Sequence, residues 1–174
     1  MKFFKHAASI GFALALASAS ASPSSAAGGK GTTTSNSLLA LILNATAFPS
    51  IAINATSTPA TVICAALHTA SPGAGGTQST SEAAYTGYLR VAMPRTSSGF
   101  TVSGNSAIFT SAITFPAATG GTETETYFSL AVPTSGTTCA GALVILYFGP
   151  ISPSIPVSSG ITPQLTVGTT ITEN

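Results

Sequence analysis

The sequence predicts an all-β protein, an antiparallel β-sandwich with a jelly-roll-like arrangement, preceded by one short N-terminal apolar helix. Three observations predict this class. Seven or eight short segments have the apolar content or alternation of strands, and turns rich in Gly, Pro and Asn separate them. The chain has 17 Gly and 11 Pro in 174 residues, which is typical of many turns. Apolar residues make up 44% of the sequence, which is enough for the core of one domain.

Residues 1–27 have the order of a secretory signal peptide. Two lysines and a histidine lie among the first six residues, an apolar run covers residues 7–17, and small residues follow. The run is too short to span a bilayer, so we expect cleavage after Ala21 or near residues 26–27. The alternative is an unprocessed flexible arm that packs on a neighbouring subunit. No other segment of the sequence is apolar and long enough to be transmembrane.

Residues 28–59 contain a Ser/Gly/Thr-rich linker and a short helix. We expect the helix to be capped by Ser35, Asn36 or Ser37 and to stop at Pro49. It is apolar nearly all round, so it should pack into a groove of its own domain or of a neighbour. Its large apolar side chains are therefore candidate interface residues: Leu38, Leu39, Leu41 and Ile42.

Residues 60–174 form the predicted β-sandwich domain. The expected strands lie at residues 60–69, 86–94, 99–103, 107–115, 127–132, 142–148, 154–157 and 164–172. In the second of these, Tyr88 and Arg90 share one face and Leu89 lies on the other. The pair Gly104-Asn105 between the third and fourth predicts a hairpin turn.

Only nine residues of the chain carry a formal charge, and none of them is aspartate. The formal net charge of +1 excludes a nucleic-acid-binding surface, because phosphate contacts need clustered Lys and Arg. Thr, Ser, Asn and Gln must supply the polar surface, and such a surface docks on a neutral partner without desolvating ions. Little remains from which to build a reactive site. We therefore expect no enzymatic activity, no catalytic or metal site, no cofactor and no small-molecule substrate.

Three features that suggest chemistry have simpler structural explanations. The glycine loop at residues 71–76 lacks the Lys-Ser/Thr ending of a phosphate-binding loop. No Gly-x-Ser-x-Gly motif accompanies His68, so we expect a hydrogen-bonded structural histidine. Glu123 and Glu125 alternate with threonines, and we expect them on a solvated face.

The two cysteines and one arginine are expected to have partners within the fold. Cys64 and Cys139 can form one disulfide that closes a loop of about 75 residues, worth roughly 4 kcal/mol. The alternative is two buried, unpaired thiols. Because charge is so scarce, we expect Arg90 to bind Glu82 or a cluster of backbone carbonyls. The alternative, that Arg90 joins the neighbouring Tyr85 and Tyr88 in an interface with a partner, stays open.

From residue 37 to the end, several segments form a collinear pattern. They are residues 38–43, 66–73, 81–92, 99–106, 113–117, 146–149, 158–163 and 171–173. In this order the segments resemble a family of small tailed-bacteriophage structural proteins, often labelled tail-fibre or virion proteins.

The resemblance implies a β-sandwich that assembles on a virion, in the tail or as a decoration of the head shell, with copies of itself and another virion protein as partners. The leader and the insert around residues 137–139 depart from the family pattern. A secreted, extracellular surface subunit, either an adhesin or a filament component, is therefore the alternative. A glycan-binding module that uses Tyr85, Tyr88 and Tyr127 is a third hypothesis.

Overall fold

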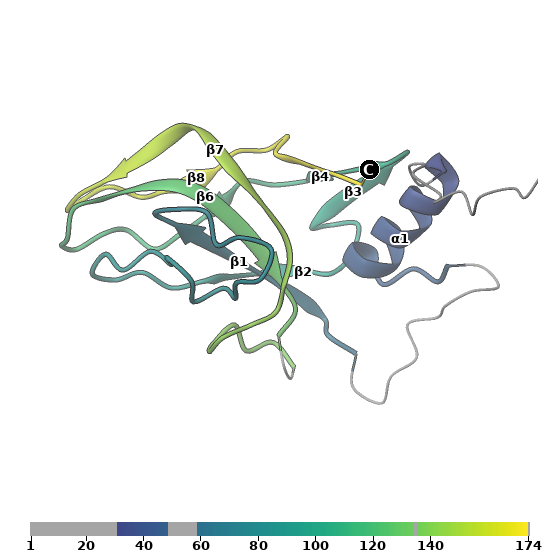
Figure 1. The fold of residues 1–174 in the computed structure, drawn as a ribbon, viewed down its shortest axis with the longest axis horizontal. Helices are drawn as coiled ribbons and strands as arrows, with labels where there is room; N and C mark the ends of the chain where they lie inside the picture. Colours follow the sequence, from purple (N-terminus) through teal and green to yellow (C-terminus); the bar gives the residue numbers. More distant parts are fainter. Residues whose placement is uncertain (1–30, 49–58, 134–135, 174) are drawn as a thin grey trace, which may run out of the picture.

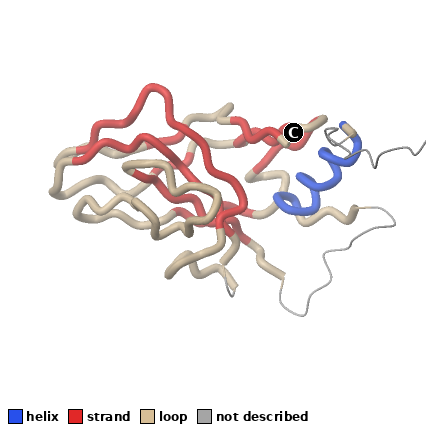
Figure 2. The backbone as a smooth tube through the Cα atoms, viewed as in Figure 1, coloured by secondary structure: helices blue, strands red, loops and turns tan. Residues whose placement is uncertain are grey.

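The computed structural model describes residues 31–48, 59–133 and 136–173, and it confirms the all-β, sandwich-like class. The described segments contain one helix and nine strands, and Figure 2 shows the helix apart from the strands and loops. The elements are α1 (Thr32–Asn44), β1 (Val62–His68), β2 (Val91–Pro94), β3 (Phe100–Ser103), β4 (Ser106–Phe109), β5 (Ile113–Thr114), β6 (Glu123–Ala131), β7 (Ile145–Val157), β8 (Gln164–Leu165) and β9 (Thr170–Thr172). The predicted leader lies outside the described residues. In the part described, no helix has the length and hydropathy needed to cross a bilayer.

Three antiparallel sheets form the sandwich, with strand orders β2-β1-β6-β7, β3-β4-β9 and β5-β8. The strand β1 is one of the two inner strands of the largest sheet, and its residues from Ile63 to His68 are all buried. This explains why its sequence is almost continuously apolar instead of alternating. Cys64 of β1 lies opposite Ala92 of β2 and Ala131 of β6.

Aromatic rings connect the sheets through the core. Phe100 of β3 and Phe109 of β4 meet edge to face, with ring centroids 5.8 Å apart. Phe109 also meets Phe128 of β6 edge to face at 6.0 Å. Because β4 and β6 belong to different sheets, Phe109 joins the two sheets directly.

The helix α1 lies at one end of the molecule, beside β3 and β4 (Figure 1). Leu39 and Leu43 are fully buried there, so the apolar helix does pack against its own domain. The expected start of the helix is wrong. The backbone N–H of Ser35 already donates to the carbonyl of Gly31 at 3.0 Å, and no side chain caps this end. Tertiary packing of the apolar side stabilises the additional turn despite the missing cap.

Arg95, directly after β2, binds the C-terminal end of α1. Its guanidinium donates to the carbonyls of Leu41 and Ile42, both at 2.5 Å, and to the carbonyl of Ala60 at 3.1 Å. The last carbonyls of a helix lack partners within the helix and lie at the negative end of its dipole. Burial lowers the pKa of Arg95 from its ordinary value, which reflects the cost of placing this cation at the helix end.

We expect Arg95→Ala to lower the free energy of unfolding by roughly 3 kcal/mol, because several charged hydrogen bonds to α1 disappear together. Urea denaturation followed by circular dichroism measures this change. Arg95→Lys keeps the charge and loses the planar fork, so it should lose less. An alanine variant as stable as the wild type would show that the hydrogen bonds of Arg95 to α1 do not stabilise the fold.

The boundaries of several strands differ from the expected ones, for three physical reasons. Residues 86–90 are not in β2, because the chain turns at Gly87, which has a φ of +97°. The expected strands at 142–148 and 154–157 are one strand, β7. Its prolines are tolerated because β7 pairs only with β6, on one side. The expected strands at 107–115 and 164–172 are each divided between two sheets. A long strand bends away from one sheet to join the next.

The predicted hairpin at Gly104-Asn105 is confirmed. Ser103 of β3 lies opposite Ser106 of β4, which leaves these two residues as the loop. Gly104 has a φ of +62°, as the first loop position of a type II′ turn requires.

Candidate functional site

Three of the buried polar side chains and one ion pair form a cluster beside β1. We call it the polar cluster, and its members are His68, Gln78, Glu82, Arg90 and Ser129. It joins β1, the segment between β1 and β2, and β6.

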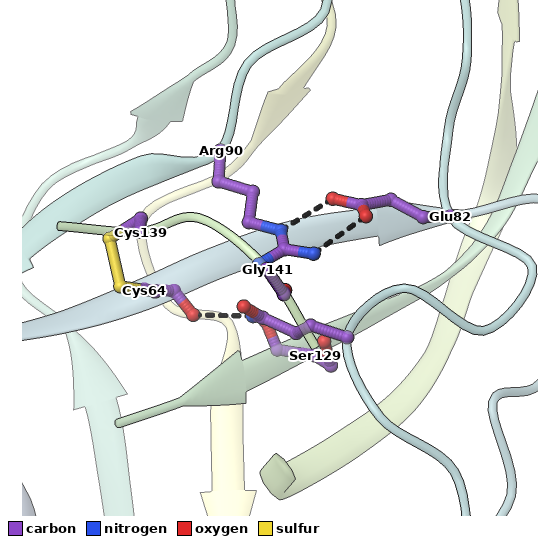
Figure 3. The surroundings of a disulfide bond; sticks show 7 residues. Cys64, Glu82, Arg90, Ser129, Cys139 and Gly141 are labelled. Carbon is purple, nitrogen blue, oxygen red and sulfur yellow. Dashed lines mark hydrogen bonds and ion pairs between the residues drawn. A yellow bond between two sulfur atoms is a disulfide. The ribbon is translucent and has the colours of Figure 1, made fainter. Parts of the chain in front are cut away.

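Arg90 binds both a carboxylate and a backbone carbonyl, the two kinds of partner that the scarcity of charge in the sequence predicted for it. Its Nε and one terminal nitrogen donate to the two carboxylate oxygens of Glu82 at 2.6 and 2.7 Å (Figure 3). A second terminal nitrogen donates to the carbonyl of Gly141 at 2.7 Å, and Ser79 Oγ accepts a further bond at 3.1 Å. The hydrogen bonds to Glu82 raise the pKa of Arg90, and the side chain is 6% exposed. The contacts of Arg90 are therefore within the chain, and they stabilise the fold.

His68 is fully buried, and its two neighbours fix its tautomer. Its Nδ1 lies 2.9 Å from the carbonyl of Thr80, which can only accept, so Nδ1 carries the proton. Its Nε2, 2.7 Å from Ser129 Oγ, therefore accepts from that hydroxyl. Burial lowers the pKa of His68 and favours this neutral form. The prediction of a hydrogen-bonded structural histidine is confirmed.

The serine–histidine pair has the hydrogen bond of a nucleophile and its base, yet it is not placed for attack. His68 and Ser129 are both 0% exposed, so no substrate carbonyl can reach the serine oxygen. The third partner is a backbone carbonyl in place of a carboxylate. The pair instead ties β1 to β6 and to the loop at Thr80.

Gln78 is a member that the sequence did not indicate. Its side-chain nitrogen donates to the carbonyl of Cys64 at 2.7 Å and to that of Ser129 at 3.4 Å. Its backbone N–H donates to the carbonyl of Leu143 at 3.0 Å. The residue is 0% exposed although it lies in a Gly/Ser/Thr-rich stretch that resembles a surface loop. Local composition therefore gave no signal for it.

Cys64 and Cys139 are joined by a disulfide, with Cα atoms 5.4 Å apart (Figure 3). The bond attaches the loop after β6 to the centre of β1. Cys64, Ala131 and Leu143 form a small buried cluster around it. This small cluster thus lies around a covalent bond between two residues that are 75 positions apart in the sequence.

The expectation of a solvated face is wrong for Glu125, which is 0% exposed. Glu123 accepts hydrogen bonds from the backbone N–H groups of Ala84 and Tyr85 at 2.9 and 2.8 Å, as an ionised carboxylate does. Glu125 meets no donor among the described residues. Burial, together with the hydrogen bond and charge of Glu123, raises the pKa of Glu125 to about 8. At neutral pH the carboxyl of Glu125 is therefore mainly protonated, and its O–H points to Glu123 as hydrogen-bond acceptor.

The candidate interface residues fall into two groups. Leu39 and Tyr85 are buried, and the hydroxyl of Tyr85 donates to the carbonyl of Pro116 at 2.9 Å. Tyr88 stacks on Phe115 and accepts a bond from the backbone N–H of Leu67 at 3.1 Å. These contacts are all within the chain. Tyr85 and Tyr88 therefore have structural roles, which argues against the hypothesis that they bind a glycan. The remaining candidates, Leu38, Leu41 and Ile42, keep part of their surface exposed on α1.

An open groove of about 560 Å³ runs between β7 and the segment from β8 to β9. Phe128 contributes to its lining, and the other lining residues are Pro150 to Pro156, Gln164 to Thr166, Thr169 and Thr170. None of them is charged. Within the described segments, no three His, Cys, Asp or Glu residues come together as a metal site would need.

Comparison with known proteins gives one family. The model of the podophage GP4 fiber I protein gp80 matches residues 29–172, which is most of the chain. The match begins after the predicted leader and includes α1 and all nine described strands. A search of curated proteins finds no significant match.

Proposed function

The chain belongs to the family of the podophage GP4 fiber I protein gp80, a structural component of a phage particle, and from this we propose how it acts. It is a non-enzymatic subunit, in the tail or on the head shell, that makes repeated contacts with copies of itself and with another virion protein. The observation that carries this proposal is a family match spread over the whole sandwich, not confined to one motif.

The character of the surface supports contact through neutral faces. Among the described residues, Leu89, Val144 and Val167 are large apolar side chains exposed by 67%, 73% and 61%. Arg90 and Glu82 are paired with each other within the fold, and the groove beside β7 has no charged lining residue. Depletion of charge is what distinguishes the centre of a protein–protein interface from ordinary surface.

We place one contact on the outer side of α1, at Leu38 and Leu41. Leu39 and Leu43 already attach the helix to the sandwich. Leu38 and Leu41 on the same helix stay partly exposed, so a partner that covers them removes apolar surface from water.

The experiment measures self-association of the purified chain by sedimentation, and its incorporation into particles by immunogold labelling. Leu38→Gln with Leu41→Gln should weaken association roughly tenfold or more while the melting temperature stays near that of the wild type. Ile161→Gln is the control, because Ile161 is an exposed aliphatic side chain outside α1 to which the proposal assigns no contact. Equal association of both variants would refute the α1 contact. A strictly monomeric chain that is absent from particles would refute the proposed function itself.

A secreted surface subunit is the second candidate, and the disulfide favours it, since structural disulfides persist in oxidising compartments. A virion released from its host cell also meets an oxidising environment. N-terminal sequencing of the mature protein distinguishes the two: cleavage near residues 21–27 supports export, and an intact Met1 in purified particles supports the virion subunit.

A further inference from the structure

The segment from Gly136 to Val144, which we call the clamped loop, is held to the body by more than its disulfide. The carbonyl of Gly141 accepts from Arg90 at 2.7 Å and from Ser79 Oγ at 3.2 Å. The carbonyl of Leu143 accepts from the backbone N–H of Gln78 at 3.0 Å.

Side-chain packing and a backbone bridge hold the same loop. Val144 forms a β-bridge with Thr77, and the side chain of Leu143 is 1% exposed against Cys64 and Ala131. None of these contacts involves a sulfur–sulfur bond. These contacts supply an attachment of the loop that is independent of the disulfide.

The two sulfurs differ in their access to solvent. Cys64 is 0% exposed at the centre of β1, between two paired strands. Cys139 is only partly buried, and its neighbours Thr137, Thr138 and Ala140 are exposed. An external oxidant can approach Cys139 without opening the sheet, whereas Cys64 is reached only when β1 is uncovered.

We propose that the disulfide closes after folding, on a clamped loop already in place, and that Cys139 is the thiol that reacts first with an external disulfide oxidant. The Cys139 thiolate attacks one sulfur of the oxidant, the oxidant's sulfur–sulfur bond breaks, and one thiol leaves. Cys64 then loses its proton and attacks the sulfur of Cys139, so the protein bond forms and the second thiol leaves. Two protein thiols are oxidised and one oxidant disulfide is reduced. A chain that folds in a reducing compartment thus has its final shape before release and gains the covalent bond afterwards.

The first experiment exposes reduced, folded single-cysteine variants of the full chain to oxidised glutathione and follows the mixed disulfide by mass spectrometry. Cys64→Ser, which retains Cys139, should react at least about tenfold faster than Cys139→Ser, which retains Cys64. In denaturant the two should react alike. Equal native rates, or faster reaction at Cys64, would overturn the proposed order.

The second experiment tests whether the clamped loop is seated without the bond. Hydrogen exchange is measured on the Cys64→Ser, Cys139→Ser double variant, with the amides of the β1–β6 ladder as internal control. The Gln78 amide, which donates to Leu143, should keep most of its protection. Loss of protection at Gln78 alone would show that the bond positions the loop, and loss throughout the ladder would show that folding requires the bond. Either result overturns the proposal.

The third experiment measures ring closure in Arg90→Lys, which keeps the charge facing Glu82 but loses the fork that reaches Gly141. Closure from the mixed disulfide to the protein bond should slow roughly tenfold, because one charged hydrogen bond to the loop is lost. The mixed disulfide at Cys139 should form at an unchanged rate. Arg95→Lys, at the far contact with α1, is the matched control and should leave both steps unchanged. Unaltered closure in Arg90→Lys would contradict the role of Arg90 in seating the loop.

Discussion

A chain with serine at both Cys64 and Cys139 is expected to be less stable than the wild type by roughly 4 kcal/mol. The bond closes a loop of 75 residues, so its removal frees a large conformational entropy in the unfolded chain. Folded domains of this size have on the order of 5–15 kcal/mol of stability, so the double variant should still fold at 25 °C. Its melting temperature should fall by roughly 10 °C.

Thermal unfolding with and without a reducing agent measures this effect. The reduced wild type should melt near the double variant, and the reducing agent should not change the melting of the double variant, which serves as the control. A reduced wild type that melts with the oxidised one would show that the bond contributes no stability.

Replacing Glu125 with glutamine is expected to stabilise the protein at alkaline pH and to change little at acid pH. The pKa of Glu125 is raised to about 8 in the folded state, against 4.5 for an unperturbed carboxyl. Below about pH 4.5 both the folded and the unfolded states hold the proton, and the free energy of unfolding does not depend on this group. Between pH 4.5 and 8 the unfolded state releases the proton while the folded state retains it, so stability falls as the pH rises.

The advantage of Glu125→Gln over the wild type should therefore grow across this window and reach on the order of 3 kcal/mol at pH 9. Urea denaturation at a series of pH values measures it. Glu123→Gln is the matched control: it weakens the acceptor of the Ala84 and Tyr85 N–H groups, so it should destabilise the protein even at pH 7. A constant difference between Glu125→Gln and the wild type from pH 4 to 9 would show that Glu125 is ionised in the folded state.

Two buried polar residues, Glu125 and Gln78, are poorly described by the local sequence. Glu125 lies in a threonine-rich stretch that is typical of solvated strands, yet it is fully buried in the folded chain. The local composition around Gln78 is typical of a surface loop, but in the folded chain Gln78 binds Cys64 and Leu143. Burial of a polar side chain is set by what folds over it, and composition within a few residues carries no information about that.

The scarcity of charge did identify one residue correctly. Since so few charged groups exist, Arg90 needed a defined partner, and Glu82 is only eight positions away. The same reasoning did not identify the contacts of Arg95. Its partners in α1 are backbone carbonyls more than fifty positions earlier, and a carbonyl has no signature in sequence.

The sequence by itself determined the all-β class, the N-terminal apolar helix, the hairpin at Gly104-Asn105 and the likeness to phage structural proteins, because strand periodicity, turn residues and motif order are local or linear properties. Only the tertiary structure decided which strands share a sheet, where α1 is fastened, and which polar groups are buried. Those outcomes depend on contacts between distant segments, whose free energy exists only once the chain has closed the loops between them.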